Sequence, residues 1–218
     1  MPKVSEQYRD ARREQILAAA RRCFLRDGFH GTSMQDLFAE SGLSSGAFYR
    51  YFAGKDELII AIAQDNFRDV AAMIHSVAQQ DGVSLGDALA DVLELINARH
   101  AEQGLGALAV QVWAEALRNP RLAEEFAGLL GQLHAEVAVV VRRHQTAGTL
   151  PAGVDPDALT SVLIGTVPGH IVQLSLLGPA ATAGSAAALR ALLPLSPAAA
   201  APPAESVAEG RAEGVAEG

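Results

Sequence analysis

Residues 33–55 read SMQDLFAESGLSSGAFYRYFAGK, two short helical patterns separated by Gly42, with a serine at the start of each. Ser33 is followed three residues later by Asp36, the spacing of a capping box at a helix N-terminus. Gly42 can adopt the positive φ that ends a helix, and Ser44 can cap the helix that follows. This pattern predicts a helix-turn-helix.

The second helix of this pair, over about residues 45–51, is too short to be stable alone and offers only Phe48 and the following Phe52 to a core. We therefore expect this helix to lie on the surface, where it can contact a binding partner. In a helix-turn-helix the second helix enters the major groove, while flanking hydroxyls and cations contact phosphates. The expected DNA-contacting residues are Ser33, Ser44, Ser45, Ala47, Tyr49, Arg50, Tyr51 and Lys55. Among the candidates for base contacts, Arg50 is the long donor, able to pair with guanine.

A competing motif overlaps the turn, because Gly42-Leu43-Ser44-Ser45-Gly46 fits the G-x-S-x-G string of a hydrolase nucleophile elbow. That elbow requires a strand before its turn. Residues 34–41 contain no β-branched side chain and carry acids at helical spacing. The string is therefore interpreted as the turn of the helix-turn-helix.

The motif YRYF is followed three residues later by Lys55 and then by an acidic-Leu pair. Together with these further positions it forms one ordered pattern: Ile16, Ala20, Phe24, Gly28, Phe29, Ser33, Leu37, Gly42, Ser44, Gly46, Tyr49, Phe52 and Leu58. With this pattern, residues 8–60 resemble the DNA-binding domain of TetR/AcrR-type transcriptional repressors. Two positions depart from the family pattern. Phe38 stands where Ala is usual, which suggests repacking against the first helix, and Ser45 stands where Lys is frequent, which removes a common phosphate contact.

The charge of the chain is divided unevenly. Of 17 Lys/Arg and 25 Asp/Glu, residues 1–55 hold nine and six, so their net charge is +3 and that of the remainder is −11. This asymmetry presents the N-terminal end to DNA and repels the rest of the chain from it. Arg9, Arg12 and Arg13 form a basic arm that could reach the minor groove.

Neither cysteine nor histidine usage indicates a metal or cofactor site. Cys23 has no partner cysteine and is expected to be a buried, inert thiol. His75, His100, His134, His144 and His170 share no i, i+3 or i, i+4 spacing, so a zinc site on one helix is not expected. The N-terminus lacks an apolar leader, and no run reaches the roughly 18 uncharged apolar residues of a membrane span without a Gly, Pro or His interruption, so we expect a cytoplasmic protein without membrane contact.

Every ordered segment has helical periodicity, which predicts an all-α fold. We expect a three-helix DNA-binding domain over residues 1–54, an effector-binding and dimerisation domain over 55–195, and a disordered Pro/Ala/Glu/Gly-rich tail over 196–218. A helix over about residues 55–79 should connect the two domains. Helices over about 156–177 and 183–193 resemble the family's dimerisation pair.

The body between the helices at 55–79 and 120–146 is predicted to hold a mainly apolar effector site. Candidate wall positions are Phe67, Ile74, Leu93, Ile96, Trp113, Leu130 and His134, with His134 or Gln111 as the polar anchor. His170 could line the pocket or the dimer interface. Because aromatic residues are only 5% of the chain, a neutral or weakly polar ligand is expected rather than a cationic one.

The resemblance implies a repressor that binds a palindromic DNA operator as a homodimer and is released by a small-molecule effector, with the helix at 55–79 transmitting the change. Two other classes stay open: a helix-turn-helix DNA-binding scaffold without an effector, and an all-α enzyme or carrier. An enclosed cavity in the body would favour the sensor. A solid core would favour the scaffold.

Overall fold

The computed structural model describes residues 6–79 and 83–193, and every regular element within those ranges is a helix. In chain order the elements are α1 (Glu6–Gly31), α2 (Met34–Ser41), α3 (Ser45–Phe48), α4 (Lys55–Gln79), α5 (Leu85–Gln103), α6 (Leu105–Ala116), α7 (Pro120–Thr146), α8 (Pro156–Leu177), η1 (Pro179–Ala181) and α9 (Ser185–Leu192). The all-α prediction is confirmed. The predicted tail at 196–218 lies outside the described residues.

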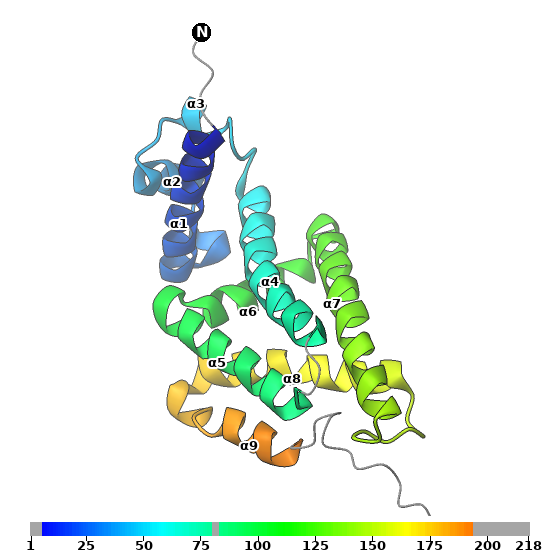
Figure 1. Ribbon diagram of the computed structural model, residues 1–218. Coiled ribbons are helices and arrows are strands. Elements are labelled where there is room, and N and C mark those ends of the chain that lie inside the picture. Colours follow the sequence, from blue (N-terminus) through cyan, green and yellow to red (C-terminus); the bar gives the residue numbers. More distant parts are fainter. Residues whose placement is uncertain (1–5, 80–82, 194–218) are drawn as a thin grey trace, which may run out of the picture.

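The first three helices form a unit at one end of the molecule (Figure 1). Their core contains Phe24, Phe48 and Leu37, none more than 1% exposed, and it continues into the first turns of α4. Leu108 and Val112 of α6 belong to the same core. The N-terminal unit is therefore packed directly on the body instead of being joined to it only through α4.

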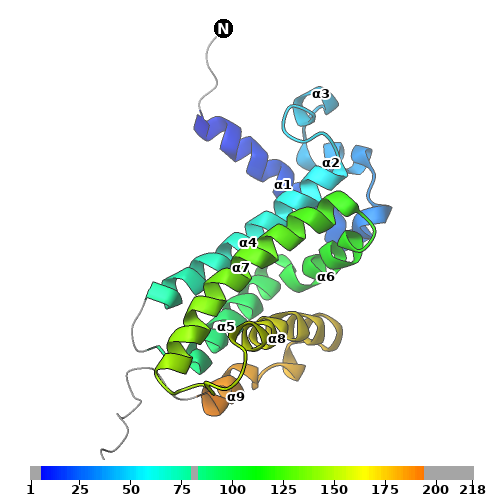
Figure 2. The ribbon, with the colours of Figure 1, turned by 90° about the vertical axis from the view of Figure 1, so that its right-hand side faces the viewer.

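The body is built around α4 and α7, which run side by side (Figure 2). A second apolar core joins α5, α6 and α8 through Val92, Ile96, Leu105, Ile171 and Leu174. Trp113 of α6 packs against both cores.

α5 and α9 are held closely together. The N–H of Gly86 donates to the carbonyl of Leu193 at 3.1 Å, and a Cβ at Gly86 would lie only 2.6 Å from the carbonyl oxygens of Leu189 and Leu193. Arg190 of α9 also donates to Asp91 at 2.9 Å and to Glu94 at 2.7 Å. Position 86 requires glycine, because any side chain would collide with the two carbonyl oxygens of α9 and the residue after it.

α8 is long and apolar enough, by length and composition, to cross a membrane, and it is the one such helix among the residues that the structure describes. It continues through Pro168 without interruption and packs against α5, α6 and α7. Its outer face remains uncovered in the single chain, because Val162, Leu176 and Leu177 are 67–73% exposed.

Candidate nucleic-acid interface and effector pocket

The cap of α2 forms as the sequence predicts. The Ser33 hydroxyl accepts from the Asp36 N–H at 3.2 Å, and the Asp36 carboxylate accepts from the Ser33 N–H at 2.8 Å and from its hydroxyl at 2.6 Å. These hydrogen bonds hold the pKa of Asp36 below its usual range. Since its hydroxyl is already bonded, Ser33 serves first as a structural cap.

The turn and the second helix also follow the expected pattern. Gly42 has φ 67° and ends α2, and the Ser44 hydroxyl accepts from the Ala47 N–H at 3.3 Å. α3 is a single turn, Ser45–Phe48, shorter than the predicted span to residue 51. Its position is fixed by Phe48 and Phe52, which are 0% and 4% exposed.

The Phe38 ring meets two rings of the α3 segment. It makes edge contacts with Phe48 at 5.1 Å and with Tyr49 at 5.6 Å between ring centroids. Sequence analysis suggested repacking against the first helix, whereas these ring contacts hold α3 against α2. Phe38 thereby supports the displayed segment.

The exposed side of α3 and the following turn carries the predicted contact residues. Ser44, Ser45 and Arg50 are exposed, and Tyr49 is 50% exposed. Ala47 and Tyr51 are half-buried, and Tyr51 packs against the N-terminal core. DNA contacts by these residues stay predictions, and Ser44, Ser45, Tyr49 and Arg50 are the most accessible of them.

Lys55 is half-buried, and its ammonium makes contacts within the protein. Its ammonium donates to the carbonyls of Phe29 at 2.9 Å and Thr32 at 2.8 Å, and it lies 4.9 Å from the centroid of the Phe29 ring. These contacts tie the start of α4 to the end of α1, where Gly28 has the non-helical φ of 74°. An ammonium has three N–H donors, so one remains for a phosphate.

Gln111 of α6 bridges the body and the end of α1. Its Oε1 accepts from the Phe29 N–H at 2.9 Å and its Nε2 donates to the Phe24 carbonyl at 3.0 Å. On the same side, His30 lies 2.9 Å from Glu115. Gln111 was predicted as a polar anchor in the pocket, but the structure uses its amide to connect α6 to α1.

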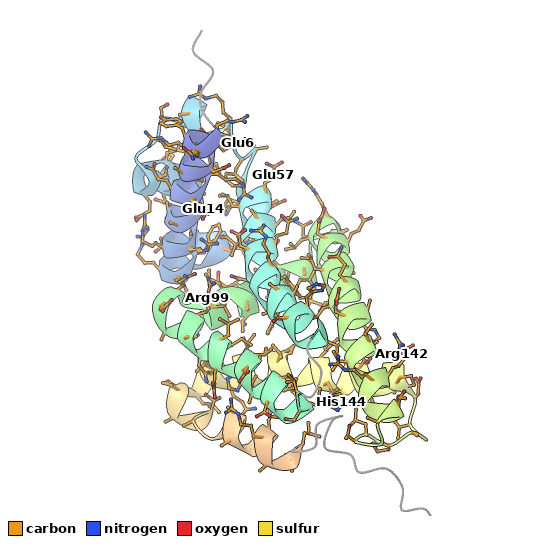
Figure 3. All side chains as sticks on the ribbon, viewed as in Figure 1. Glu6, Glu14, Glu57, Arg99, Arg142 and His144 are labelled. Atoms are coloured by element: carbon orange, nitrogen blue, oxygen red, sulfur yellow. The ribbon has the colours of Figure 1, made fainter. Side chains whose placement is uncertain are left out.

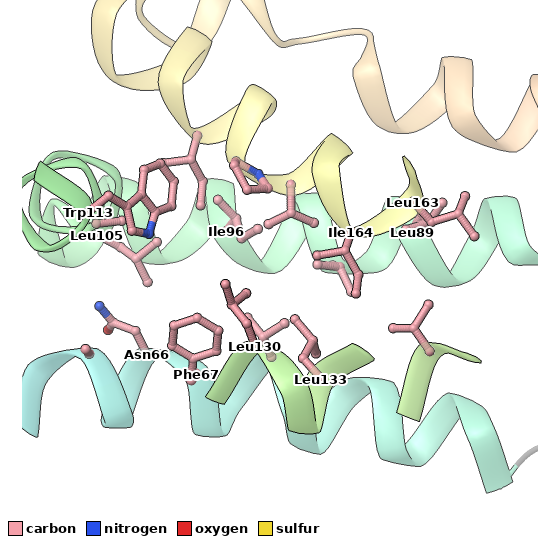
Figure 4. A pocket seen from close by; sticks show the side chains of 18 of the residues that line it. Asn66, Phe67, Leu89, Ile96, Leu105, Trp113, Leu130, Leu133, Leu163 and Ile164 are labelled. Atoms are coloured by element: carbon pink, nitrogen blue, oxygen red, sulfur yellow. The ribbon is translucent and has the colours of Figure 1, made fainter. Parts of the chain in front are cut away.

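A partly open pocket of about 140 Å³ lies inside the body, between α4, α5, α6, α7 and α8 (Figure 4). Four of the predicted wall residues line it: Phe67, Ile96, Trp113 and Leu130. Most of the remaining lining residues are Leu, Val, Ile and Ala, including Leu89, Leu133, Leu163 and Ile164, together with Asn66, Phe126 and Pro168. The expectation of a mainly apolar site with few aromatic rings agrees with this lining.

The other predicted pocket residues lie elsewhere. Leu93 is buried in the core beside the pocket, and His134 is 3.5 Å from the Ser161 hydroxyl, between α7 and α8. His170 is buried and lies 2.8 Å from Asn97 Oδ1, and its burial lowers its pKa. The side chain of Ile74 lies outside those that the structure describes.

His144 lies near the end of α7, at the opposite end of the body from α3 (Figure 3). It is 1% exposed, its Nδ1 is 2.8 Å from the Thr149 hydroxyl, and desolvation lowers its pKa. This local contact gives one of the two ring nitrogens a partner. Cys23 is buried and its thiol pKa is raised by desolvation, in agreement with the unreactive thiol predicted from the sequence.

Asn66 is a polar lining residue that was not among the predicted wall positions. It stands three residues after Ala63 and four before Val70, both of which also line the pocket. That helical spacing places it on the inner face of α4, a signal that was available in the sequence. Its amide is a hydrogen-bonding group in an otherwise apolar lining.

The displayed second helix and the hollow helical body together define a helix-turn-helix transcriptional regulator. Comparison with known proteins agrees. The model of "Bacterial regulatory proteins, tetR family" matches residues 16–62, and that of "BetI-type transcriptional repressor, C-terminal" matches residues 86–194. The chain belongs to the tetR family of bacterial regulatory proteins.

Full-length relatives support the same assignment. The HTH-type transcriptional regulator UidR of Escherichia coli strain K12 is 29% identical over 186 residues, which cover 83% of this chain and 90% of UidR. The structure of Salmonella enterica GusR is similar with a TM-score of 0.70 and 28% identity, over 88% of this chain and 99% of GusR. FadR of Bacillus subtilis, solved in complex with stearoyl-CoA, has a TM-score of 0.69 at 17% identity, over 83% and 97% of the two chains, and shares the fold.

Proposed function

We propose that this protein is a ligand-responsive transcriptional repressor that binds a palindromic operator as a homodimer and is released by a small, mainly apolar effector. The observation that carries the proposal is the pocket in the body, because two of its walls, α4 and α6, also contribute to the core of the DNA-binding domain. A ligand that moves either helix would therefore act on the helix-turn-helix. We propose a cytoplasmic location, where the operator is accessible.

The uncovered face of α8 and α9 supports a homodimer. Leu176 and Leu177 of α8 and Leu192 of α9 are 73%, 68% and 75% exposed in the single chain. Burial of large apolar side chains is favourable, and a two-fold interface would bury the copies of these side chains on both protomers. A dimer also presents two copies of the short α3, which doubles the number of bases read.

The pocket favours a sensor over the open alternatives. A scaffold without effector has no need of a cavity, whereas a cavity of this kind costs packing energy that a ligand can restore. An enzyme or carrier function has no support from UidR and FadR, which are transcriptional regulators. The match to a repressor C-terminal domain supports repression as the direction of control.

Selection of bound sequences from a random DNA duplex library, with the full chain, tests this proposal. Inverted repeats should emerge, with half-site centres roughly 34 to 60 Å apart. The same selection with Arg50→Ala should lose one base preference in each half-site, because the long donor is removed, while Arg118→Ala, an exposed cation outside the helix-turn-helix, should not. Recovery of only asymmetric sites would contradict the dimeric operator.

A further inference from the structure

The lining of the pocket restricts the chemistry of its ligand. Of the 23 described residues that line it, only Asn66 and Trp113 carry a polar side-chain atom, and none carries a charge. A charged group inside would lose its hydration without gaining a counter-charge. The buried part of the ligand is therefore uncharged.

The shape of the pocket indicates a chain and not a ring system. Its lining follows one face of α7 at Phe126, Leu130, Leu133, Val137 and Val140, which spans about 21 Å at 1.5 Å per residue. The space that its walls enclose is only about 140 Å³, and because the pocket is partly open, a longer ligand can extend beyond the enclosed part. So little volume along so long a wall describes a narrow channel.

The two polar groups lie at the same end of this channel. Figure 4 shows Asn66 and Trp113 at one end of the pocket and Leu89 and Leu163 toward the other. Neither the Asn66 amide nor the Trp113 indole N–H makes a hydrogen bond with another residue that the structure describes. Both groups are therefore available to a ligand at the end of the pocket nearest the DNA-binding domain.

We propose that the pocket binds a single-chain aliphatic molecule with an uncharged carbonyl head group, such as a fatty amide or ester. The carbonyl oxygen accepts from the Asn66 amide and the Trp113 indole N–H, while the alkyl chain lies between α5 and α7. This inference rests on the proposed function, because it names the class of effector for the same site.

Binding of straight-chain amides to the intact protein tests the inference directly. Trp113 is the single tryptophan of the chain, so its emission reports occupancy without a label. From hexanamide to decanamide the affinity should rise about fourfold per added methylene, since each buried methylene contributes about 0.8 kcal/mol. Decanoate, fully ionised at neutral pH, should bind at least tenfold more weakly than decanamide. Adamantane carboxamide, which is compact and rigid, should also bind weakly.

Two variants locate the head group and the chain separately. Asn66→Leu keeps the approximate volume but removes the amide, so the preference for decanamide over decane should fall about tenfold. Val137 lies about 16 Å further along α7 than Phe126, whose ring contacts Phe67 next to Asn66. Val137→Phe therefore narrows the channel away from Asn66, and should weaken decanamide binding at least tenfold while leaving hexanamide within about twofold. The two variants thus serve as controls for each other.

Several results would overturn the inference. The pocket would not be a narrow channel if affinity did not depend on chain length. The same conclusion would follow if adamantane carboxamide bound as tightly as decanamide. If Asn66→Leu kept the full preference for decanamide over decane, Asn66 would not bind the head group. If other compounds release the protein from its operator while amides do not bind, only this inference fails. If the protein selects no operator, the proposed function fails whatever the amides do.

Discussion

The DNA-binding domain and the body differ in how their interiors are filled. In the first, Phe24, Phe48 and Leu37 are fully buried against one another and the helix starts are capped by their own side chains. In the second, the helices surround a pocket that apolar side chains line but do not fill. The contrast indicates that the two regions have different roles. The DNA-binding domain is rigid, whereas the body can change its packing when a ligand enters.

Truncating one phenylalanine in each region should give the largest difference between them. Phe48→Ala removes a ring with 0% exposure from the solid core and should cost about 3–5 kcal/mol of unfolding free energy. Phe67→Ala removes a half-buried ring that packs edge-on against Phe126 and borders the pocket, so it should cost less than Phe48→Ala. Urea unfolding followed by circular dichroism measures both. Equal losses would show that the body is packed as tightly as the DNA-binding domain.

Dimerisation should depend on the outer face of the body. Leu176→Glu combined with Leu192→Glu places charges on the exposed apolar surface of α8 and α9 and should yield monomers in analytical ultracentrifugation. Operator affinity should fall at least a hundredfold, because one α3 then binds alone. Leu117→Glu is the control, since Leu117 is 90% exposed but lies at the end of α6. Dimers that persist in the double variant would place the interface elsewhere.

The connection between the two regions should depend on Gln111. Gln111→Leu leaves the Phe29 N–H and the Phe24 carbonyl without their partner, and should lower the unfolding free energy by about 1–3 kcal/mol. The effector should then lower operator affinity by a smaller factor than in the unaltered protein, although Trp113 emission still reports binding. Gln132→Leu, at an exposed position on α7, is the control. A full response in Gln111→Leu would remove this route.

The smallest effect is expected for Lys55, which lies where the DNA-binding domain meets α4. Lys55→Ala should lower the slope of log affinity against log salt by about 0.9, if the remaining N–H of Lys55 contacts a phosphate. Specific and non-specific duplexes should be affected alike. An unchanged slope with reduced thermal stability would assign Lys55 only to its contacts with Phe29 and Thr32.

The sequence predicted the DNA-binding domain better than the pocket because the two depend on interactions of different range. Ser33, Asp36, Gly42 and Ser44 act on backbone within a few residues, so local spacing was sufficient to predict the caps and the turn. Pocket residues depend on how five helices are rotated and aligned. Helical periodicity showed which residues face inward but not which neighbour each would meet.

Gln111 illustrates that limit, whereas Asn66 does not. α6 has inward-facing sides toward both the pocket and α1, and an amide at position 111 could have faced either one. Asn66 interrupts the apolar pattern of α4, although its spacing from Ala63 and Val70 places it on the same face. Only the Gln111 assignment required the contacts between helices.

The two hydrogen bonds of Gln111 also set an energy scale for switching. A net contribution of about 0.5–1.5 kcal/mol from each gives about 1–3 kcal/mol for the pair, the range of a typical allosteric coupling energy. One side chain can therefore account for as much free energy as an effector must redistribute between the bound and released states. At such a scale the ratio of the two conformations changes by about five- to 150-fold, enough for graded control without unfolding any helix.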